Sequence, residues 1–235
     1  MLRARNSTTS RVPAARVTTN LGVARLANDS FSTVWNDLSP NGYNGEDHTG
    51  GTWPFFDGVG DYVVAPGPYV ETGDPLGLPI TADLTSATME CWMKPAGLAA
   101  HSRLISINSD TTTGYLLISL RTTGELRCYV NNSNRAQSAL GVITVGPWFH
   151  IAMTAGTGLA PVIYLNGADV TLASTAIAYP QSDSQIAVGA TLYNPPGPST
   201  TQLFHGDIDT VRVYERILSP DEVLMNYNAG LAAHQ

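Results

Sequence analysis

The chain has 235 residues, a formal net charge of −7 and only 13% charged residues. This balance argues against a surface that coats nucleic acid, and no apolar window is long enough to insert into a membrane. Apolar residues make up 43% of the chain, which excludes a disordered protein, and the 22 glycines and 15 prolines favour many short strands joined by turns.

Residues 1–30 differ from the rest and predict an extended basic arm. They are rich in Thr, Ser, Asn and Arg and show no sustained period, so alone they should be flexible. Before the first acidic residue, Asp29, stand Arg3, Arg5, Arg11, Arg16 and Arg25. Arginine pairs bidentately with carboxylates. These five are therefore candidates for docking the arm on an acidic neighbouring subunit or, alternatively, on the protein's own surface.

From residue 31 onward, short apolar or alternating runs recur between turn residues, which is typical of β-strands. In chain order the predicted strands are Tyr62–Val64, Ala87–Met93, Arg103–Ile107, Tyr115–Leu120, Glu125–Val130, Trp148–Ala155, Val162–Leu165, Gln185–Val188 and Gly206–Tyr214. Asn166-Gly167 is the strongest hairpin signal, because both central positions of a type I′ turn need positive φ. Many short antiparallel strands predict an all-β sandwich or barrel.

A short helix is predicted near the end of the chain. Ser219 is its expected cap, Pro220 suits its first turn, and Glu222 stands three residues after the cap, as in a capping box. Gly230 is expected to end the helix.

Seven segments match, in order, the strands and turns of one known architecture. They are Trp35–Gly42, Phe56–Val63, Thr88–Pro95, the pair Trp148–Ala152 and Tyr164–Gly167, Phe204–Tyr214 and Leu218–Val223. Together they resemble the laminin-G-like, concanavalin-A-like jelly-roll family over about residues 31–228. The resemblance implies an antiparallel β-sandwich over residues 31–235. It leaves function open, because this fold hosts lectins, adhesion modules, hydrolases and virion proteins.

Asp207 and Asp209 fall on one face of a predicted strand, because residues two apart share a face. Some glycoside hydrolases of this fold carry a Glu-x-Asp-x-Glu series, but the third position here is Val211. We therefore expect these aspartates to cap loops and to pair with Arg212 or Arg216. With no nucleophile motif beside a histidine either, the sequence predicts a protein that is not an enzyme.

Three other side chains of chemical interest have structural interpretations. Cys91 and Cys128 lie in predicted strands and are expected to be buried thiols, with a disulfide as the alternative. His150 is expected to be half-buried and hydrogen-bonded inside the sandwich.

No cofactor is expected, and calcium is the one metal alternative. Calcium prefers six to eight oxygen ligands. Turn-like positions hold Asp37, Asp57, Asp61 and Asp207, but no contiguous ligand loop is present. Solvated aspartates are therefore the expected state.

Two functional hypotheses remain. The first is a structural protein of a bacteriophage virion, a capsid decoration or head–tail protein that forms a homo-oligomer and is anchored by its arm to capsid or tail subunits. Its support is the arm, the low charge and the missing apolar segment of a secretory signal. The alternative is an extracellular or cell-surface module that binds glycans through loop aromatics, with Trp53 and Tyr193 as candidates.

Overall fold

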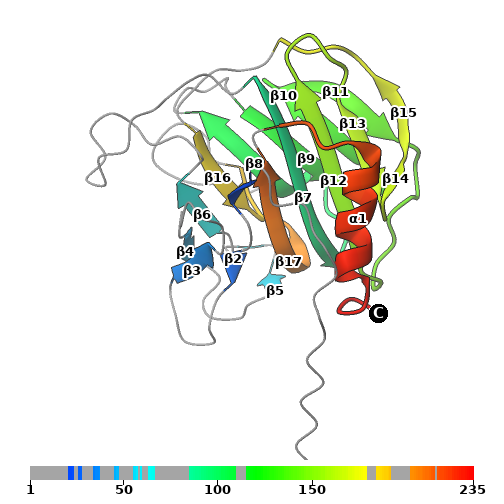
Figure 1. The fold of residues 1–235 in the computed structure, drawn as a ribbon. Helices are drawn as coiled ribbons and strands as arrows, with labels where there is room; N and C mark the ends of the chain where they lie inside the picture. The colour runs from blue at the N-terminus through cyan, green and yellow to red at the C-terminus, as the bar shows by residue number, and fades with distance from the viewer. Residues whose placement is uncertain are drawn as a thin grey trace, which may run out of the picture.

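The computed structural model describes residues 85–109, 115–178, 184–191, 202–214 and 216–235, with the short stretches 21–23, 26–27, 34–37, 45–47, 55–57, 59 and 63–66. Most of these residues lie in two antiparallel sheets that pack face to face, with one helix near the C-terminus (Figure 1). The predicted all-β sandwich with a short C-terminal helix is confirmed.

In this part of the chain, one sheet has seven strands and the other ten. The seven-stranded sheet runs in the order β1 (Leu21–Val23), β17 (His205–Tyr214), β7 (Ser86–Pro95), β12 (Phe149–Gly156), β13 (Val162–Leu165) and β14 (Ala168–Asp169), and β5 (Phe55–Asp57) also pairs with β17. The ten-stranded sheet runs in the order β15 (Thr171–Ser174), β11 (Ser133–Ser138), β10 (Leu126–Val130), β9 (Tyr115–Leu120), β8 (Ser102–Ser109), β16 (Ser184–Val188), β6 (Val63–Pro66), β4 (Gly45–Asp47), β3 (Val34–Asp37) and β2 (Leu26–Ala27).

The core lies between the two sheets and follows the two-residue period of the strands. On β7, Met89, Cys91 and Met93 point into it, and each side chain is fully buried. The opposing sheet contributes Ile118 and Cys128 at paired positions of β9 and β10. Both cysteines are buried free thiols, as predicted, and burial raises the pKa of each thiol well above its usual range.

Local turn chemistry explains where the hairpins close. Asn166 and Gly167 both have positive φ, at 51° and 81°, and they join β13 to β14 as predicted. Asn131 and Asn132, at 50° and 63°, join β10 to β11 in the same way. The predicted strands over 115–120 and 162–165 match β9 and β13 residue for residue.

Two short strands fall inside the segment that the sequence predicts to be a separate arm. β1 pairs with β17, where Leu21 lies opposite Tyr214, and β2 pairs with β3. Residues 21–23 and 26–27 therefore extend the sheets.

The helix α1 (Pro220–Leu231) begins with the predicted capping box. Ser219 Oγ accepts from the Glu222 backbone at 3.3 Å, and the Glu222 carboxylate accepts from the Ser219 backbone at 2.8 Å. Arg216 donates to both Glu222 carboxylate oxygens, and this hydrogen bonding lowers the pKa of Glu222 to about 2. The expected end at Gly230 is wrong, because α1 continues to Leu231 and Gly230 serves packing against Trp92.

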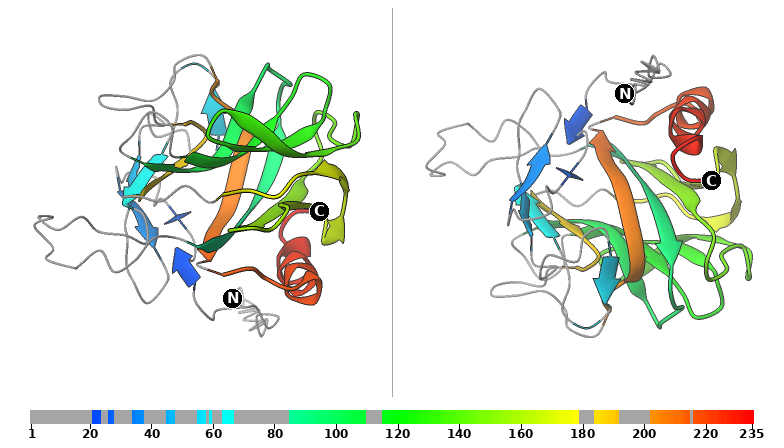
Figure 2. Two further views of the ribbon diagram at one scale, coloured as in Figure 1. Left: turned by 90° about the horizontal axis from the view of Figure 1, so that it is seen from above. Right: turned by 90° about the horizontal axis from the view of Figure 1, so that it is seen from below.

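The described residues form three layers (Figure 2). The ten-stranded sheet is one outer layer, the seven-stranded sheet lies in the middle, and α1 covers part of the outer face of the seven-stranded sheet. No helix in the described part is long and apolar enough to cross a membrane. The sandwich therefore presents two outer faces, one on each side of the core.

Candidate functional site

The outer face of the ten-stranded sheet carries a row of polar side chains. Strand register places Arg103 of β8 opposite Ser119 of β9, Ser119 opposite Arg127 of β10, and Arg127 opposite Gln137 of β11. The core-facing residues of these strands occupy the alternate positions, so this row points away from the core. Four successive strands therefore present polar groups side by side.

Arg103 is the most deeply placed member of the row. Its side chain is only 3% exposed, and its Nε and Nη2 atoms donate to Gln202 Oε1 at 3.1 and 2.6 Å. The guanidinium lies over the ring of Tyr129, 5.3 Å from the ring centroid. Its Nη1 atom and the hydroxyl of buried Ser119 have no hydrogen-bond partner. The inner end of the row thus holds a guanidinium donor and a hydroxyl that are both buried and unpaired.

Arg127 is already paired with a carboxylate. It donates to both Glu125 oxygens at 2.8 and 3.1 Å and to the Tyr129 hydroxyl at 3.3 Å. Hydrogen bonding by Glu125 is the main reason that the pKa of Arg127 is raised well above its usual range.

Arg121 directly follows β9, and His101 directly precedes β8. Arg121 Nη1 contacts the ring nitrogens of His101. Burial, and then the charges of Arg121, Arg103 and Arg127, lower the pKa of His101. The imidazole is therefore neutral at neutral pH and accepts from Arg121. We call His101, Arg103, Arg121 and Arg127 the basic cluster.

Around the basic cluster stand groups that suit hydrogen bonding to hydroxyls. Asn134 lies opposite Tyr129, is exposed, and donates through its amide to Gln137 Oε1 at 2.8 Å. Charged donors in a partly buried setting favour anions, and side-chain amides favour neutral polar groups. The arrangement is suited to a polar ligand that carries negative charge.

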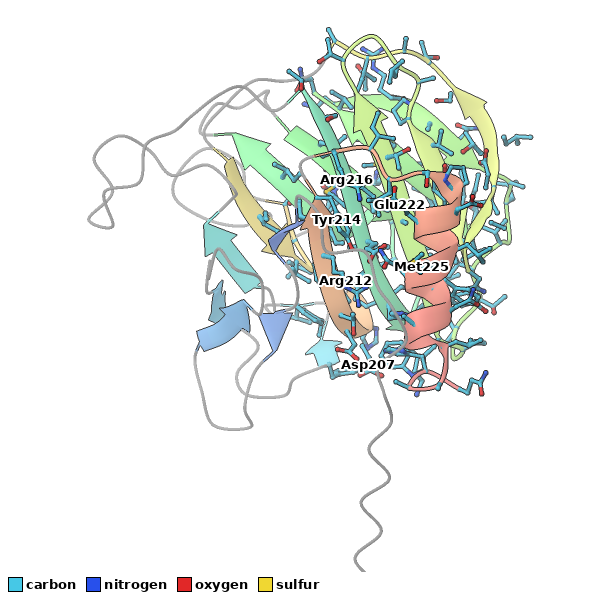
Figure 3. All side chains as sticks on the ribbon, in the orientation of Figure 1. Asp207, Arg212, Tyr214, Arg216, Glu222 and Met225 are labelled. Carbon is cyan, nitrogen blue, oxygen red and sulfur yellow. The ribbon has the colours of Figure 1, made fainter. Side chains whose placement is uncertain are left out.

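A second polar network lies on the opposite side of the sandwich, beneath α1. Its centre is Glu90 of β7, which is fully buried. Arg212 Nη1 donates to Glu90 Oε1 at 2.7 Å, and the amide of Asn226 on α1 donates to Glu90 Oε2 at 3.2 Å. The same amide lies 2.9 Å from the Tyr214 hydroxyl. Figure 3 shows Arg212 and Tyr214 on β17, with α1 beside them.

The charge state of Glu90 follows from its neighbours. Burial raises its pKa, but the ring of His150 and the guanidinium of Arg212 outweigh that effect and leave the pKa below the ordinary value. Tyr214 Oη lies 3.5 Å from Glu90 Oε1, and both residues are fully buried. No substrate reaches this pair while α1 is docked, so the network holds the helix on the sheet.

The structure corrects the predicted pairing of two arginines. Arg212 pairs with Glu90 and Arg216 with Glu222, so neither binds Asp207 or Asp209. Asp209 accepts from the Thr210 backbone at 2.7 Å, which is a local cap, and lies 3.1 Å from His234.

His150 is fully buried rather than half-buried. Its Nε2 atom lies 3.6 Å from Glu90, and neither ring nitrogen has a hydrogen-bond partner, so the expected hydrogen bond is wrong. The sequence analysis did not predict that Glu90 is the centre of a polar network, because this residue stands within an apolar run.

Most of the other predicted site residues lie outside the part of the chain that the structure describes. The positions outside the described residues are Arg3, Arg5, Arg11, Arg16, Arg25, Trp53 and Tyr193, and among the calcium candidates Asp61 and the side chains of Asp37 and Asp57. Within the described part, no group of three His, Cys, Asp or Glu side chains could hold a metal ion.

A sandwich of two antiparallel sheets is shared by many kinds of domain, lectins among them. The family model described as the concanavalin A-like lectin/glucanases superfamily matches residues 42–224. The chain therefore belongs to this superfamily, as the sequence resemblance predicts. No curated protein matches the chain in a search of such proteins.

Solved structures share the fold at low identity. A mutant of Trypanosoma rangeli sialidase displaying trans-sialidase activity matches 93% of this chain and 34% of its own, with a TM-score of 0.68 and 17% identity. The same sialidase in complex with sialic acid gives the same values. The binding domain of Paraclostridial Mosquitocidal Protein 1 matches 89% of this chain and 52% of its own, with a TM-score of 0.56 and 17% identity.

These matches correct the expectation that the chain is not an enzyme. Solved structures of a sialidase match 93% of the chain, so the expectation that the chain is not an enzyme is contradicted. The chain spans about a third of the length of that enzyme, at 17% identity. The likeness therefore shows a shared fold and does not assign an activity to this chain.

Proposed function

We propose that this chain is a carbohydrate-recognition domain that binds glycans on the outer face of its ten-stranded sheet. The observation that carries the proposal is the row from Arg103 to Gln137, where charged, hydroxyl and amide groups from four strands stand side by side. Glycan recognition needs such donors at fixed spacing, because sugar hydroxyls are bound by directed hydrogen bonds. Membership of the lectin/glucanase superfamily and the likeness to a sialidase solved with sialic acid support it.

Glycan binding is tested with the full chain on an immobilised panel of neutral and acidic oligosaccharides, followed by titration of the best ligand. We expect measurable affinity for at least one glycan and a drop of about 10-fold on Asn134→Ala, which removes an amide donor worth about 1.4 kcal/mol. Asn228→Ala is the matched control, because this exposed residue stands on α1, on the other side of the sandwich.

The loop aromatics predicted from the sequence give the competing site. Tyr193→Ala and Trp53→Ala variants are measured beside Asn134→Ala. Loss of binding with these and not with Asn134→Ala would move the site to the loops. Each bound glycan is also followed for release of free sugar, because the matching sialidase is an enzyme. Release by the wild-type chain would assign cleavage as well as recognition, and no binding to any glycan would refute the proposal.

The virion assembly role stays a prediction, because it depends on the arginines of the predicted arm. Residues 21–23 and 26–27 pair with other strands, so the test is a deletion of residues 1–20 only. If the role is correct, the shortened chain keeps its circular dichroism spectrum but no longer sediments with large particles from its native source. Sedimentation at the wild-type position would contradict it.

A further inference from the structure

The basic cluster carries more positive charge than the carboxylates around it neutralise. Arg127 is paired with Glu125, but among the described residues no carboxylate lies within salt-bridge distance of Arg103 or Arg121. The whole chain, in contrast, carries a net charge of −7. A local surplus of guanidinium groups on an acidic chain is therefore a particular feature of this face.

The surplus is also partly desolvated. Arg103 is 3% exposed and keeps Nη1 without a partner. Burying an unpaired charge costs free energy, which an arriving anion recovers by pairing with it. Carboxylate and sulfate groups match the planar fork of a guanidinium and accept two parallel hydrogen bonds from it.

We propose that the basic cluster binds an acidic oligosaccharide, with the anionic group held by Arg103 and Arg121 and the sugar hydroxyls held by Asn134 and Gln137. This inference rests on the proposed function and names the ligand class of the same site. Arg103 and Gln137 stand three strands apart, a span on the order of 14 Å at the usual strand spacing. The site is therefore longer than one sugar ring, which points to an oligosaccharide.

His101 gives an independent signature of anion binding. The groups that face it are Arg121, Arg103, Arg127 and the ring of Tyr129, and the three positive charges contribute to its lowered pKa. A bound anion opposes these charges and raises the pKa, so binding takes up a proton. By linkage the affinity then increases as the pH falls from about 7.5 toward about 5.5, through the histidine range.

The experiment measures the affinity of the full chain by calorimetry for sialyllactose and lactose, which differ by one acidic sugar, and for tetragalacturonic acid and a sulfated heparin tetrasaccharide. Arg103→Lys keeps the positive charge and removes the planar guanidinium. Arg121→Gln removes the charge of a half-buried residue, and it tests the proposal even if the Arg103 variant does not fold. Lys94→Gln is the control, because it removes one charge from the other sheet. Circular dichroism checks the fold of each variant.

We expect binding of at least one acidic ligand, with a 10- to 100-fold loss on Arg121→Gln and on Arg103→Lys, little change on Lys94→Gln, and stronger binding at lower pH. Whichever acidic series binds identifies the anion as carboxylate or sulfate. Binding of lactose as tight as that of every acidic ligand, or acidic binding that both arginine variants keep, would overturn this inference and leave glycan recognition standing. Absence of binding to every sugar would overturn both.

Discussion

Replacing Glu90 by alanine is expected to lower the free energy of unfolding by about 3–5 kcal/mol, as for other buried ion pairs that lose one partner. The variant leaves Arg212, which is 4% exposed, with an unpaired charge beneath α1. It also removes the oxygen that accepts from the Asn226 amide. The change is measured as the shift in the midpoint of urea unfolding, followed by circular dichroism.

Glu125→Ala is the matched control for this prediction. Glu125 is also buried and also pairs with an arginine, but the Arg127 side chain is 26% exposed and can be solvated once its partner is gone. We therefore expect a loss of about 1 kcal/mol or less.

The double variant Glu90→Leu with Arg212→Met tests the cause. It removes both charges together and should recover most of the loss, because apolar residues often replace a buried ion pair at little cost. If the double variant is no more stable than Glu90→Ala, the unpaired charge is not the source of the loss.

The elements that the sequence predicted are those set by neighbouring residues. β9 and β13 follow from their own patterns, and the Asn166-Gly167 turn and the Ser219 cap follow from rules that span two to four residues. The sequence analysis did not predict β11, because its residues are polar and lack the apolar alternation of a strand. Pairing with β10 and β15 makes this segment a strand.

The sites were harder to predict, because distant segments build them. Glu90 is joined by Arg212 and Asn226, which are 122 and 136 residues away in the chain. In the basic cluster, the alternation of Glu125, Arg127 and Tyr129 is visible in the sequence. The position of Arg103 beside them is not, because a register shift follows it in β8. The alternation of residues in a sequence predicts which face of the sheet a side chain occupies. The register between neighbouring strands decides which side chains meet there.

Trp92→Ala is expected to cost about 3–5 kcal/mol and to free α1 before the sandwich unfolds. The Trp92 ring is 1% exposed and stacks on His234, with centroids 4.2 Å apart and planes 3° apart. A Cβ atom at Gly230 would come within 2.3 Å of Trp92 Nε1, so the helix packs directly on the ring. Gly230→Ala tests this contact from the helix side, with an expected loss of about 1–3 kcal/mol.

Hydrogen exchange distinguishes loss of helix docking from loss of the core. Trp92 and Glu90 lie on the face of β7 that points to α1, whereas Met89, Cys91 and Met93 fill the core. We therefore expect faster exchange over 220–231 than over β9 and β10 in Trp92→Ala. A uniform increase across both sheets would mean that Trp92 stabilises the whole sandwich. Because the basic cluster lies on the other outer face, glycan affinity should stay at the wild-type value wherever the sandwich remains folded, so the two faces can be altered separately.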